Sequence, residues 1–418
     1  DGNDNIGAKV VADVLQRAGI AVGYCPPELA SRYRIVLVSL HSTHDVYAFY
    51  RAVALLPSWQ PGKRTFRVLA GGYGMQNPTA IRRYVDYAAF GRVEGWIAPV
   101  VDAVLGGGEP PTHESLMCLP ALAPVKIAQP EVLYPHEVAG RREQLTGCPN
   151  RCKFCHYSHA RRHIGEGEYI QTGLTGGTTP ELMWRQLYDY PQKAGRVRVA
   201  IDGFSERLRY AYGKHITNAD IIRGIEAMGR FGGTTTLLVC NVSNFPGETA
   251  ADREELYRTL ASAQPKGRVI FVLCSTPFRP SLATSMQWEP VSLQPDNSQW
   301  RERVIVDREN LRAVHSFTLE TPWSHLISVV GERATPETDR LFHAICFAAG
   351  LQRDRDADKL RRAAAHFDLT PYLREYDPEE QHPAWFVDGA VPRIRLAATC
   401  RKMRAEQATG RLAERIAT

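Results

Sequence analysis

Three cysteines that lie within eight residues constrain this chain more than any other feature of its sequence. Cys148, Cys152 and Cys155 have the spacing C-x3-C-x2-C, on a stretch made polar by arginine, lysine and a Pro-Asn turn. Three thiolates on a short loop can bind three irons of a cubane cluster, because cysteine is the usual ligand of such clusters. The fourth iron would have no protein ligand and could bind a small molecule. The spacing therefore predicts an iron–sulfur site with one open position.

A structural zinc site is the alternative interpretation of the same cysteines, with His156 or His159 as the fourth ligand. Such sites usually show two CxxC pairs or Cys2His2 spacing, and this sequence has neither. The other six cysteines are scattered and form no CxxC pair: Cys25, Cys118, Cys240, Cys274, Cys346 and Cys400. They predict buried thiols, without a disulfide framework or a second cluster. Both interpretations remain open on the cysteines alone, and the cluster is favoured.

Composition sets broad limits on the class of protein. The 418 residues suffice for two or three domains, and a hydrophobic fraction of 44% suffices for their cores. The net charge of +6 permits a partner that carries phosphates but does not require one. No run of about 18 apolar residues occurs, so no membrane span is predicted. The first residues lack the charged and apolar regions of a secretory signal, and we expect a cytoplasmic protein.

Alternating helix-like and strand-like runs predict an α/β domain over residues 1–115. Helical spacing covers 8–18, 46–56 and 78–87 (the last beginning after Asn77 with Pro78), and apolar runs rich in β-branched residues cover 34–40 and 66–71. This pattern is typical of a doubly wound, Rossmann-like parallel sheet. Ligands of such sheets bind at the carboxyl ends of the strands, where the loops 39–45 and 71–77 are expected.

A glycine- and proline-rich stretch at 106–111 predicts a boundary, with a linker up to about residue 138. The alternation then resumes over 139–295 and predicts a (βα) partial barrel. Its expected strands are 196–201, 235–241 and 268–274, and its expected helices are 180–188, 219–230 and 250–262. Thr217 and Thr249 are the expected N-caps of the last two helices. Residues 296–418 are expected to be mostly helical, with the clearest helical spacing at 335–349.

At the cysteines the sequence resembles the radical S-adenosylmethionine (SAM) superfamily, whose signature is C-x3-C-x2-C with an aromatic residue, here Phe154, before the third cysteine. The segments 202–217, 241–252 and 275–288 resemble, in the expected order, those of superfamily members that carry a cobalamin domain. The resemblance covers roughly residues 140–290. It implies that the cysteines hold a [4Fe–4S] cluster, that SAM is cleaved to a 5′-deoxyadenosyl radical, and that flavodoxin or ferredoxin donates electrons.

The resemblance also implies SAM-binding positions at the carboxyl edge of the barrel. They are Phe154, Asp202, Gly203, Ser205, Glu206, Arg207, Asn241 and Ser243. Asp202 and Gly203 stand where the family usually has a Gly-Gly-Glu-like segment, so backbone contacts would have to serve there. Arg207 could pair with the SAM carboxylate, because arginine binds carboxylates through two hydrogen bonds, or it could form a surface salt bridge.

The loops around residues 71–78 and 90–95 resemble those of the cobalamin-binding domain that precedes some radical SAM barrels. The positions that this resemblance assigns to cobalamin are Ser39, His41, Ser42, Gly71, Gly72, Gly74, Gly91 and Glu94. Glycines would let the backbone approach a flat, bulky corrin. The D-x-H-x-x-G motif that supplies an axial histidine is missing, which leaves open whether this domain binds the cofactor.

Three functions follow as hypotheses. The first is cobalamin-dependent methyl transfer to an unactivated carbon. The second is radical SAM modification of a nucleic acid or nucleoside without cobalamin, in which the basic segment 393–415 would contact phosphates. The third is a binding module without catalysis, which predicts no SAM cleavage. The substrate, a small molecule or a nucleic acid, cannot be identified from the sequence.

Overall fold

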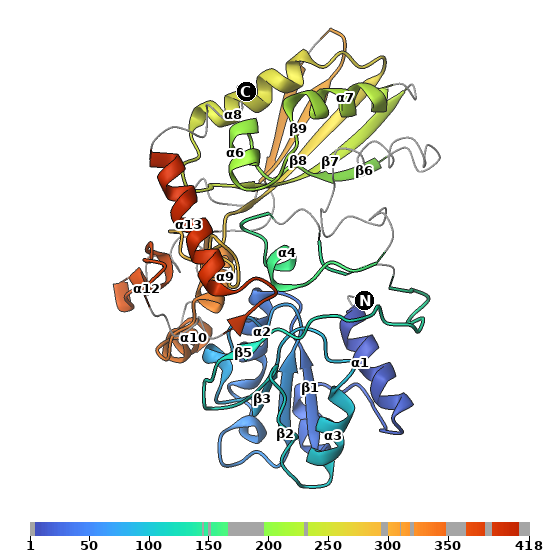
Figure 1. The fold of residues 1–418 in the computed structure, drawn as a ribbon, viewed down its shortest axis with the longest axis vertical. Helices are drawn as coiled ribbons and strands as arrows, with labels where there is room; N and C mark the ends of the chain where they lie inside the picture. The colour runs from blue at the N-terminus through green and yellow to red at the C-terminus, as the bar shows by residue number, and fades with distance from the viewer. Residues whose placement is uncertain are drawn as a thin grey trace.

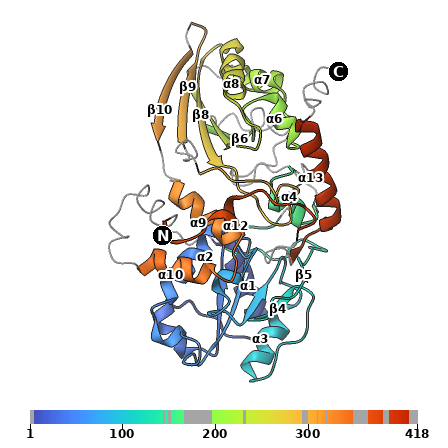
Figure 2. The ribbon, with the colours of Figure 1, turned by 90° about the vertical axis from the view of Figure 1, so that its left-hand side faces the viewer.

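The computed structural model describes residues 5–143, 146–148, 152–165, 196–229, 233–293, 300–309, 311–317, 322–347, 365–380 and 387–408. Its two larger β-sheets lie at opposite ends of the molecule (Figure 1). The short helix α4 (His156–Ala160) and the helix α9 (Pro322–Glu332) lie between them in both views (Figures 1 and 2). No helix in the described ranges is long and apolar enough to cross a membrane.

The first sheet has four strands in the order β1, β2, β3, β4, which are Ile35–Ser39, Arg67–Gly71, Tyr87–Ala89 and Leu116–Cys118. The first three are parallel, and β4, from the expected linker, pairs antiparallel with β3. Val68 and Ala70 belong to one buried cluster and Leu69 to another, so helices cover both faces. The flanking helices are α1 (Ile6–Arg17) and α3 (Ile97–Leu105) on one face and α2 (Thr43–Val53) on the other.

This topology corrects the expectation of a doubly wound sheet in one respect. The strand order runs without a reversal, so the described part of the sheet has no topological switch point. The expected helix over 78–87 is also wrong. Only a 3-10 turn forms there, η3 (Thr79–Ile81), and β3 follows it. The apolar residues that suggested a helix, Ile81, Tyr84 and Val85, are buried from this turn and its flank.

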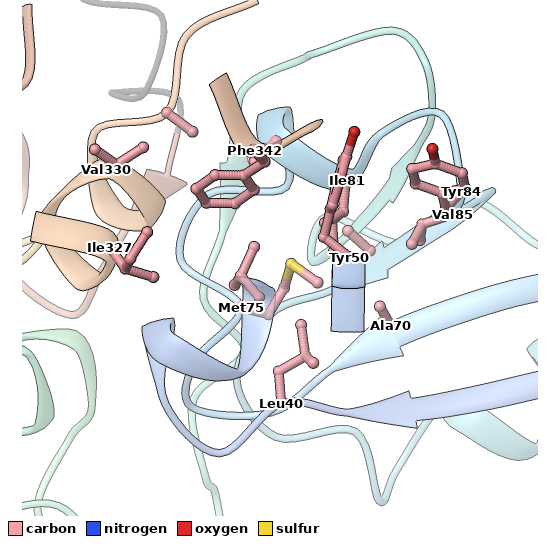
Figure 3. Packing of buried hydrophobic residues seen from close by; sticks show 14 of the residues in the cluster. Leu40, Tyr50, Ala70, Met75, Ile81, Tyr84, Val85, Ile327, Val330 and Phe342 are labelled. Atoms are coloured by element: carbon pink, nitrogen blue, oxygen red, sulfur yellow. The ribbon is translucent and has the colours of Figure 1, made fainter. Parts of the chain in front are cut away.

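Helices from the C-terminal part of the chain complete the core of the first sheet. Side chains of α9 and of α10 (Thr338–Phe347) join the cluster that contains Leu40 and Met75. Figure 3 shows Ile327 and Val330 of α9, with Phe342 of α10, beside residues of the first sheet and its loops. Asn77 fixes this contact, because its Nδ2 donates to the carbonyls of Glu332 and Ala334 at 3.1 and 2.9 Å.

The second sheet has five strands in the order β10, β9, β8, β7, β6. Its strands in chain order are β6 (Arg196–Ala200), β7 (Thr234–Ser243), β8 (Arg268–Pro277), β9 (Trp300–Val306) and β10 (Leu311–Phe317). The first three are parallel, as expected for a partial barrel. The helices α6 (Glu206–Ala211), α7 (Asn218–Gly229) and α8 (Ala250–Ser262) belong to the same part of the chain (Figure 1). The expected helix over 180–188 lies outside the described residues.

Local signals position α7 and α8. Thr249 and Asp252 form a capping box at the start of α8, and the Thr217 hydroxyl accepts from the amide of Asp220 at 3.0 Å before α7. Residues of both helices, such as Ile225 and Leu256, pack in one cluster with β7 and β8. Both N-caps and both helices were expected from the sequence.

The expectation of a mostly helical C-terminal region is wrong for residues 300–317, which form the antiparallel strands β9 and β10. Glu302, Val304 and Val306 are buried and Arg303 is exposed, the two-residue alternation of a strand. The rest agrees with helices, which are α9, α10, α12 (Thr370–Leu373) and α13 (Arg393–Ala408). A two-residue strand β11 (Val387–Asp388) pairs with β5 (Val125–Lys126) of the expected linker.

Candidate functional site

The cysteine loop is held against the end of α6, close to the carboxyl ends of the parallel strands of the second sheet. The Lys153 amide donates to the carbonyl of Tyr212 at 2.8 Å, and the Cys152 thiol approaches the carbonyl of Gly213 at 3.9 Å. Within the loop, the hydroxyl of Ser158 donates to the carbonyls of Cys152 and Cys155 at 3.2 and 3.0 Å. Backbone contacts therefore fix this turn without using the thiols of Cys148 or Cys155.

The aromatic residue before the third cysteine packs into the protein. The ring of Phe154 lies 5.2 Å from that of Phe245, in a small cluster that includes Tyr212 and Met403 of α13. Phe154, expected beside SAM, therefore anchors the loop through its apolar contacts. The nine cysteines all fall within the described residues, and none forms a disulfide.

Burial controls the charge of the thiols. It raises the pKa of both Cys152 and Cys155, and Cys152 is only 5% exposed. The ammonium of Lys214, itself 1% exposed, acts on Cys152 in the opposite direction. Burial lowers the pKa of Lys214, but Asp202, whose carboxylate lies 3.2 Å away, outweighs burial and leaves that pKa raised. A buried, charged lysine therefore lies beside the cysteines.

The ends of β6, β7 and β8 meet at one edge next to this lysine. The Gly203 amide donates to the side chain of Asn241 at 2.6 Å, and the Asn241 amide approaches the hydroxyl of Ser275 at 3.4 Å. Asp202 has a φ of 48°, a left-handed conformation that is uncommon for a residue other than glycine. The structure thus brings Asp202, Gly203 and Asn241 together at the edge where the sequence placed them.

The next three expected SAM contacts are engaged with the protein itself. The hydroxyl of Ser205 donates to Asp252 at 2.5 Å, and the carboxylate of Glu206 accepts from the amide of Asn218 at 2.6 Å. Arg207 forms an ion pair with Asp252 at 2.7 Å, which agrees with the salt-bridge alternative. Ser243 is fully buried, and its hydroxyl has no hydrogen-bond partner among the described residues.

The donor set suits iron more readily than a hydrated cation such as magnesium. Sulfur ligands select soft or borderline metals and iron–sulfur clusters, whereas magnesium prefers oxygen. No three His, Cys, Asp or Glu side chains in the described ranges are arranged to share one metal ion. Thiolates of a cubane do not share an ion, because each binds a different iron. The three thiols therefore fit the cluster in chemistry and spacing.

The glycines assigned to cobalamin have a different physical reason in this structure. A Cβ on Gly72 would lie 2.4 Å from the Leu40 carbonyl oxygen, and one on Gly74 would lie 2.2 Å from that of Ser42. A Cβ on Gly91 would lie 2.4 Å from the Ala128 carbonyl oxygen. These glycines are required because loops of the chain itself pass close together. They form no open cradle for a corrin.

The other positions assigned to cobalamin lie near the same edge of the first sheet. Ser39 is exposed and accepts a hydrogen bond from Asn5, and Gly71 ends β2. The backbone amides of His41 and Ser42 both donate to Asp45, at 2.7 and 2.8 Å, which caps α2. Glu94 pairs with Arg92 at 2.9 Å. No contact among these residues singles out a corrin.

A pocket lies where this edge meets the cysteine loop. Its lining residues come from both parts of the chain: Gly72, Tyr73, Met75, Gln76, Phe90, Gly91, Ile127, His156, Arg161 and Leu282. It holds about 320 Å³ including the space at its mouth. The ring of Tyr73 meets that of His156, the residue after Cys155, at 5.4 Å. Burial lowers the pKa of His156 to about 4, and its neutral ring donates from Nδ1 to the Leu282 carbonyl at 2.6 Å.

Sequence reasoning missed two residues at this junction. Lys214 lies in a segment with a recognised resemblance, and its place one residue after a glycine turn gave the only available signal. Tyr73 gave no signal, because its importance comes from the approach of α4, which is far away in the sequence.

No protein-family model matches the chain, and no curated protein matches it. Among solved structures, the chain is similar to the radical S-adenosylmethionine methyltransferase TsrM from Kitasatospora setae, determined with its tryptophan substrate and the SAM analogue aza-SAM. The identity is 15% and the TM-score is 0.27, and the match covers 66% of this chain. The match spans 56% of the TsrM chain, little more than half of its length.

Proposed function

We propose that this chain is a radical SAM enzyme in which Cys148, Cys152 and Cys155 hold a [4Fe–4S] cluster. The observation that carries the proposal is the position of three thiols with this spacing beside the carboxyl edge of β6, β7 and β8. Open α/β sheets bind their ligands at that edge. A bound cluster would supply the electron that breaks a C–S bond of SAM, and reduced flavodoxin or ferredoxin would be its donor.

The chain's own residues would give this site its charge balance and its shape. Lys214 and Asp202 place one buried ion pair beside the thiols, and the ammonium opposes the negative charge of bound thiolates. Asn241 fixes the turn at Gly203 by accepting its amide. The burial of Cys152 and Phe154 keeps water from the inner side of the loop. A dry, fixed site of this kind protects reactive species from side reactions.

Methyl transfer to an unactivated carbon, with cobalamin as methyl carrier, is the reaction we propose for this enzyme. Its support is the pocket between the first sheet and the cysteine loop, where family members with a cobalamin domain would hold the cofactor. That pocket as it stands is smaller than a corrin, and Gly72 and Gly91 abut the chain's own backbone. Corrin binding would require these loops to move, so we derive no catalytic step through cobalamin.

Modification of a nucleic acid finds less support. Basic residues of α13, expected to contact phosphates, are engaged in ion pairs within the protein. Arg401 pairs with Glu379, and Arg404 lies 2.9 Å from both Glu289 and Glu375. A surface that binds phosphates needs cations that can release counterions on contact, and cations in internal pairs supply less of this effect.

Anaerobic reconstitution with iron and sulfide tests the cluster. The wild-type chain should bind about four irons and show the broad visible absorption of thiolate-ligated iron. Cys148→Ala should lose both, whereas the control Cys118→Ala, on an exposed thiol of β4, should keep both. The reduced wild-type protein should release 5′-deoxyadenosine from SAM. Stoichiometric zinc without iron, or equal iron in both variants, would overturn the proposal.

Cobalamin is tested separately in the same preparation. Hydroxocobalamin is added, and the protein is desalted before its spectrum is recorded. Retained corrin bands support methyl transfer through cobalamin. Iron without retained corrin refutes the cobalamin part and leaves the radical SAM part standing. Tight binding of transfer RNA with a steep salt dependence would favour the nucleic-acid alternative.

A further inference from the structure

A stripe of buried polar side chains on α9 has unmet hydrogen-bonding capacity. His325, Ser328 and Glu332 follow one another at spacings of three and four residues, so they lie on one face of the helix. They are 0%, 0% and 2% exposed. Both ring nitrogens of His325, the Ser328 hydroxyl and one carboxylate oxygen of Glu332 have no hydrogen-bond partner among the described residues. Each buried polar group left in this state costs about 1–3 kcal/mol.

An arginine approaches the same stripe from the second sheet. Arg279 follows the end of β8, and its Nη1 lies 3.5 Å from the hydroxyl of Thr43. That hydroxyl also lies 3.4 Å from the carboxylate of Glu332, which is equally far from the hydroxyl of Ser281. Arg279 and Glu332 are thus on either side of Thr43. Within the described residues, Arg279 nevertheless forms no ion pair within 4.0 Å.

The electrostatics agree with this geometry. Burial raises the pKa of Glu332, and Arg279 is the strongest of the groups that oppose the rise. Burial lowers the pKa of His325 to about 3, and Arg279 lowers it further. A carboxylate and a guanidinium therefore act on one buried space without neutralising each other in a direct pair.

The stripe adjoins the pocket beside the cysteine loop. Tyr73 lines that pocket, and both Glu332 and Arg279 act on its phenol, whose pKa burial raises. Leu282 lines the pocket three residues after Arg279. Gln76 also lines it, is 2% exposed, and has a side-chain oxygen without a partner among the described residues. Polar groups thus stand beside a wall that is largely aromatic and apolar.

The pairing of opposite charges selects among ligands. A metal cation would be repelled by Arg279, and a phosphate would be repelled by Glu332. A ligand with an ammonium next to a carboxylate satisfies both, because it donates to Glu332 and accepts from the guanidinium. We infer that Glu332 and Arg279, with Thr43, bind the head group of a free L-amino acid whose apolar or aromatic side chain enters the pocket lined by Tyr73 and Leu282.

As a statement about the enzyme's substrate, this inference rests on the proposed function. As a statement about binding it does not, because no contact involves the cysteines. Failure of the cluster therefore leaves the amino-acid site testable, and the two ideas can fail independently.

Calorimetric titration of the full 418-residue chain with single L-amino acids tests the site. Leucine, phenylalanine and tryptophan should bind, and N-acetylleucine and leucinamide, which each lack one charge of the head group, should bind at least tenfold more weakly. Glu332→Gln, which keeps the shape of the side chain, should weaken leucine binding at least tenfold. Arg279→Lys should weaken it severalfold, because lysine lacks the second hydrogen bond.

Matched controls are Glu379→Gln and Arg374→Gln, which remove the same charges from exposed ion pairs far from the stripe. They should bind leucine as the wild type does, and circular dichroism should show all variants folded. Equal binding by the wild type and Glu332→Gln would overturn the inference. So would the failure of all three amino acids to bind at millimolar concentration, or binding of SAM alone at this site.

Discussion

Arg209 offers the sharpest test of how the edge of the second sheet is held. This residue of α6 is fully buried and joins two loops beside Lys214. Its Nε donates to the carbonyl of Ile216 at 2.6 Å, and its Nη1 donates to the carbonyls of Gly203 and Phe204 at 3.1 and 3.2 Å. Its Nη2 donates to Asn218. Burial lowers its pKa to about 10, which leaves the guanidinium charged at neutral pH.

Arg209→Met should lower the free energy of unfolding by about 3–5 kcal/mol. The substitution leaves three carbonyl oxygens without this donor, and each unmet buried group costs about 1–3 kcal/mol. Methionine retains much of the apolar contact, and partial access of water to the carbonyls limits the sum. Arg209→Lys keeps the charge but can reach only some of the acceptors, so it should cost about half as much, roughly 2 kcal/mol.

Urea unfolding followed by far-ultraviolet circular dichroism measures these changes. The control is Arg223→Met on α7, where the arginine is 61% exposed and pairs with Asp220. That change should cost no more than about 1 kcal/mol, because exposed ion pairs contribute little. A cost for Arg209→Met equal to that of the control would refute the reasoning. Iron binding should fall with Arg209→Met as well, since Gly203 would lose its anchor.

Three further predictions concern the junction between the sheets. Gly74→Ala should cost about 3 kcal/mol in chemical unfolding, because its Cβ would lie 2.2 Å from the Ser42 carbonyl oxygen, whereas Gly95→Ala, with no atom within 4 Å, should be neutral. Asn77→Ala should cost about 2 kcal/mol and increase hydrogen exchange at the end of α9, since two carbonyls lose their donor. His325 has a folded pKa of about 3, below its unfolded value, so it contributes stability above about pH 6.5 that is lost as the pH falls toward 3. Relative to His325→Gln, the wild type should therefore lose about 2 kcal/mol between pH 7 and pH 5, and a difference that stays constant with pH would contradict this.

The elements that follow from local signals could be predicted from the sequence. Thr249 begins α8 through a capping box, and the β-branched runs became β1, β6, β7 and β8. The failures come from contacts distant in the sequence. Asn77 suggested a helix, but its side chain instead joins a short turn to α9. Residues 300–317 form strands because β8 offers an edge on which β9 can pair.

The candidate site shows the same division. The cysteines and the edge at Asp202 and Asn241 could be read from the sequence, because each lies directly after a recognisable element. The partner of Asp202 could not be read, since Lys214 reaches it only after α6 turns the chain back. Glu332 gave no signal at all, because its neighbours Thr43 and Ser281 come from the two ends of the molecule.

The glycines show why such a signal needs a structure to interpret it. Glycine lets backbone approach backbone as readily as it lets backbone approach a ligand, so the sequence pattern around Gly72 and Gly74 cannot tell the two apart. The atom that a Cβ would strike does tell them apart, and here it belongs to Leu40 or Ser42. Groups with unmet hydrogen bonds give the opposite signal, because a folded chain gains nothing from burying them alone. Glu332 and His325 are such groups, and the search for a ligand of this chain should therefore start from α9 rather than from the glycine loops.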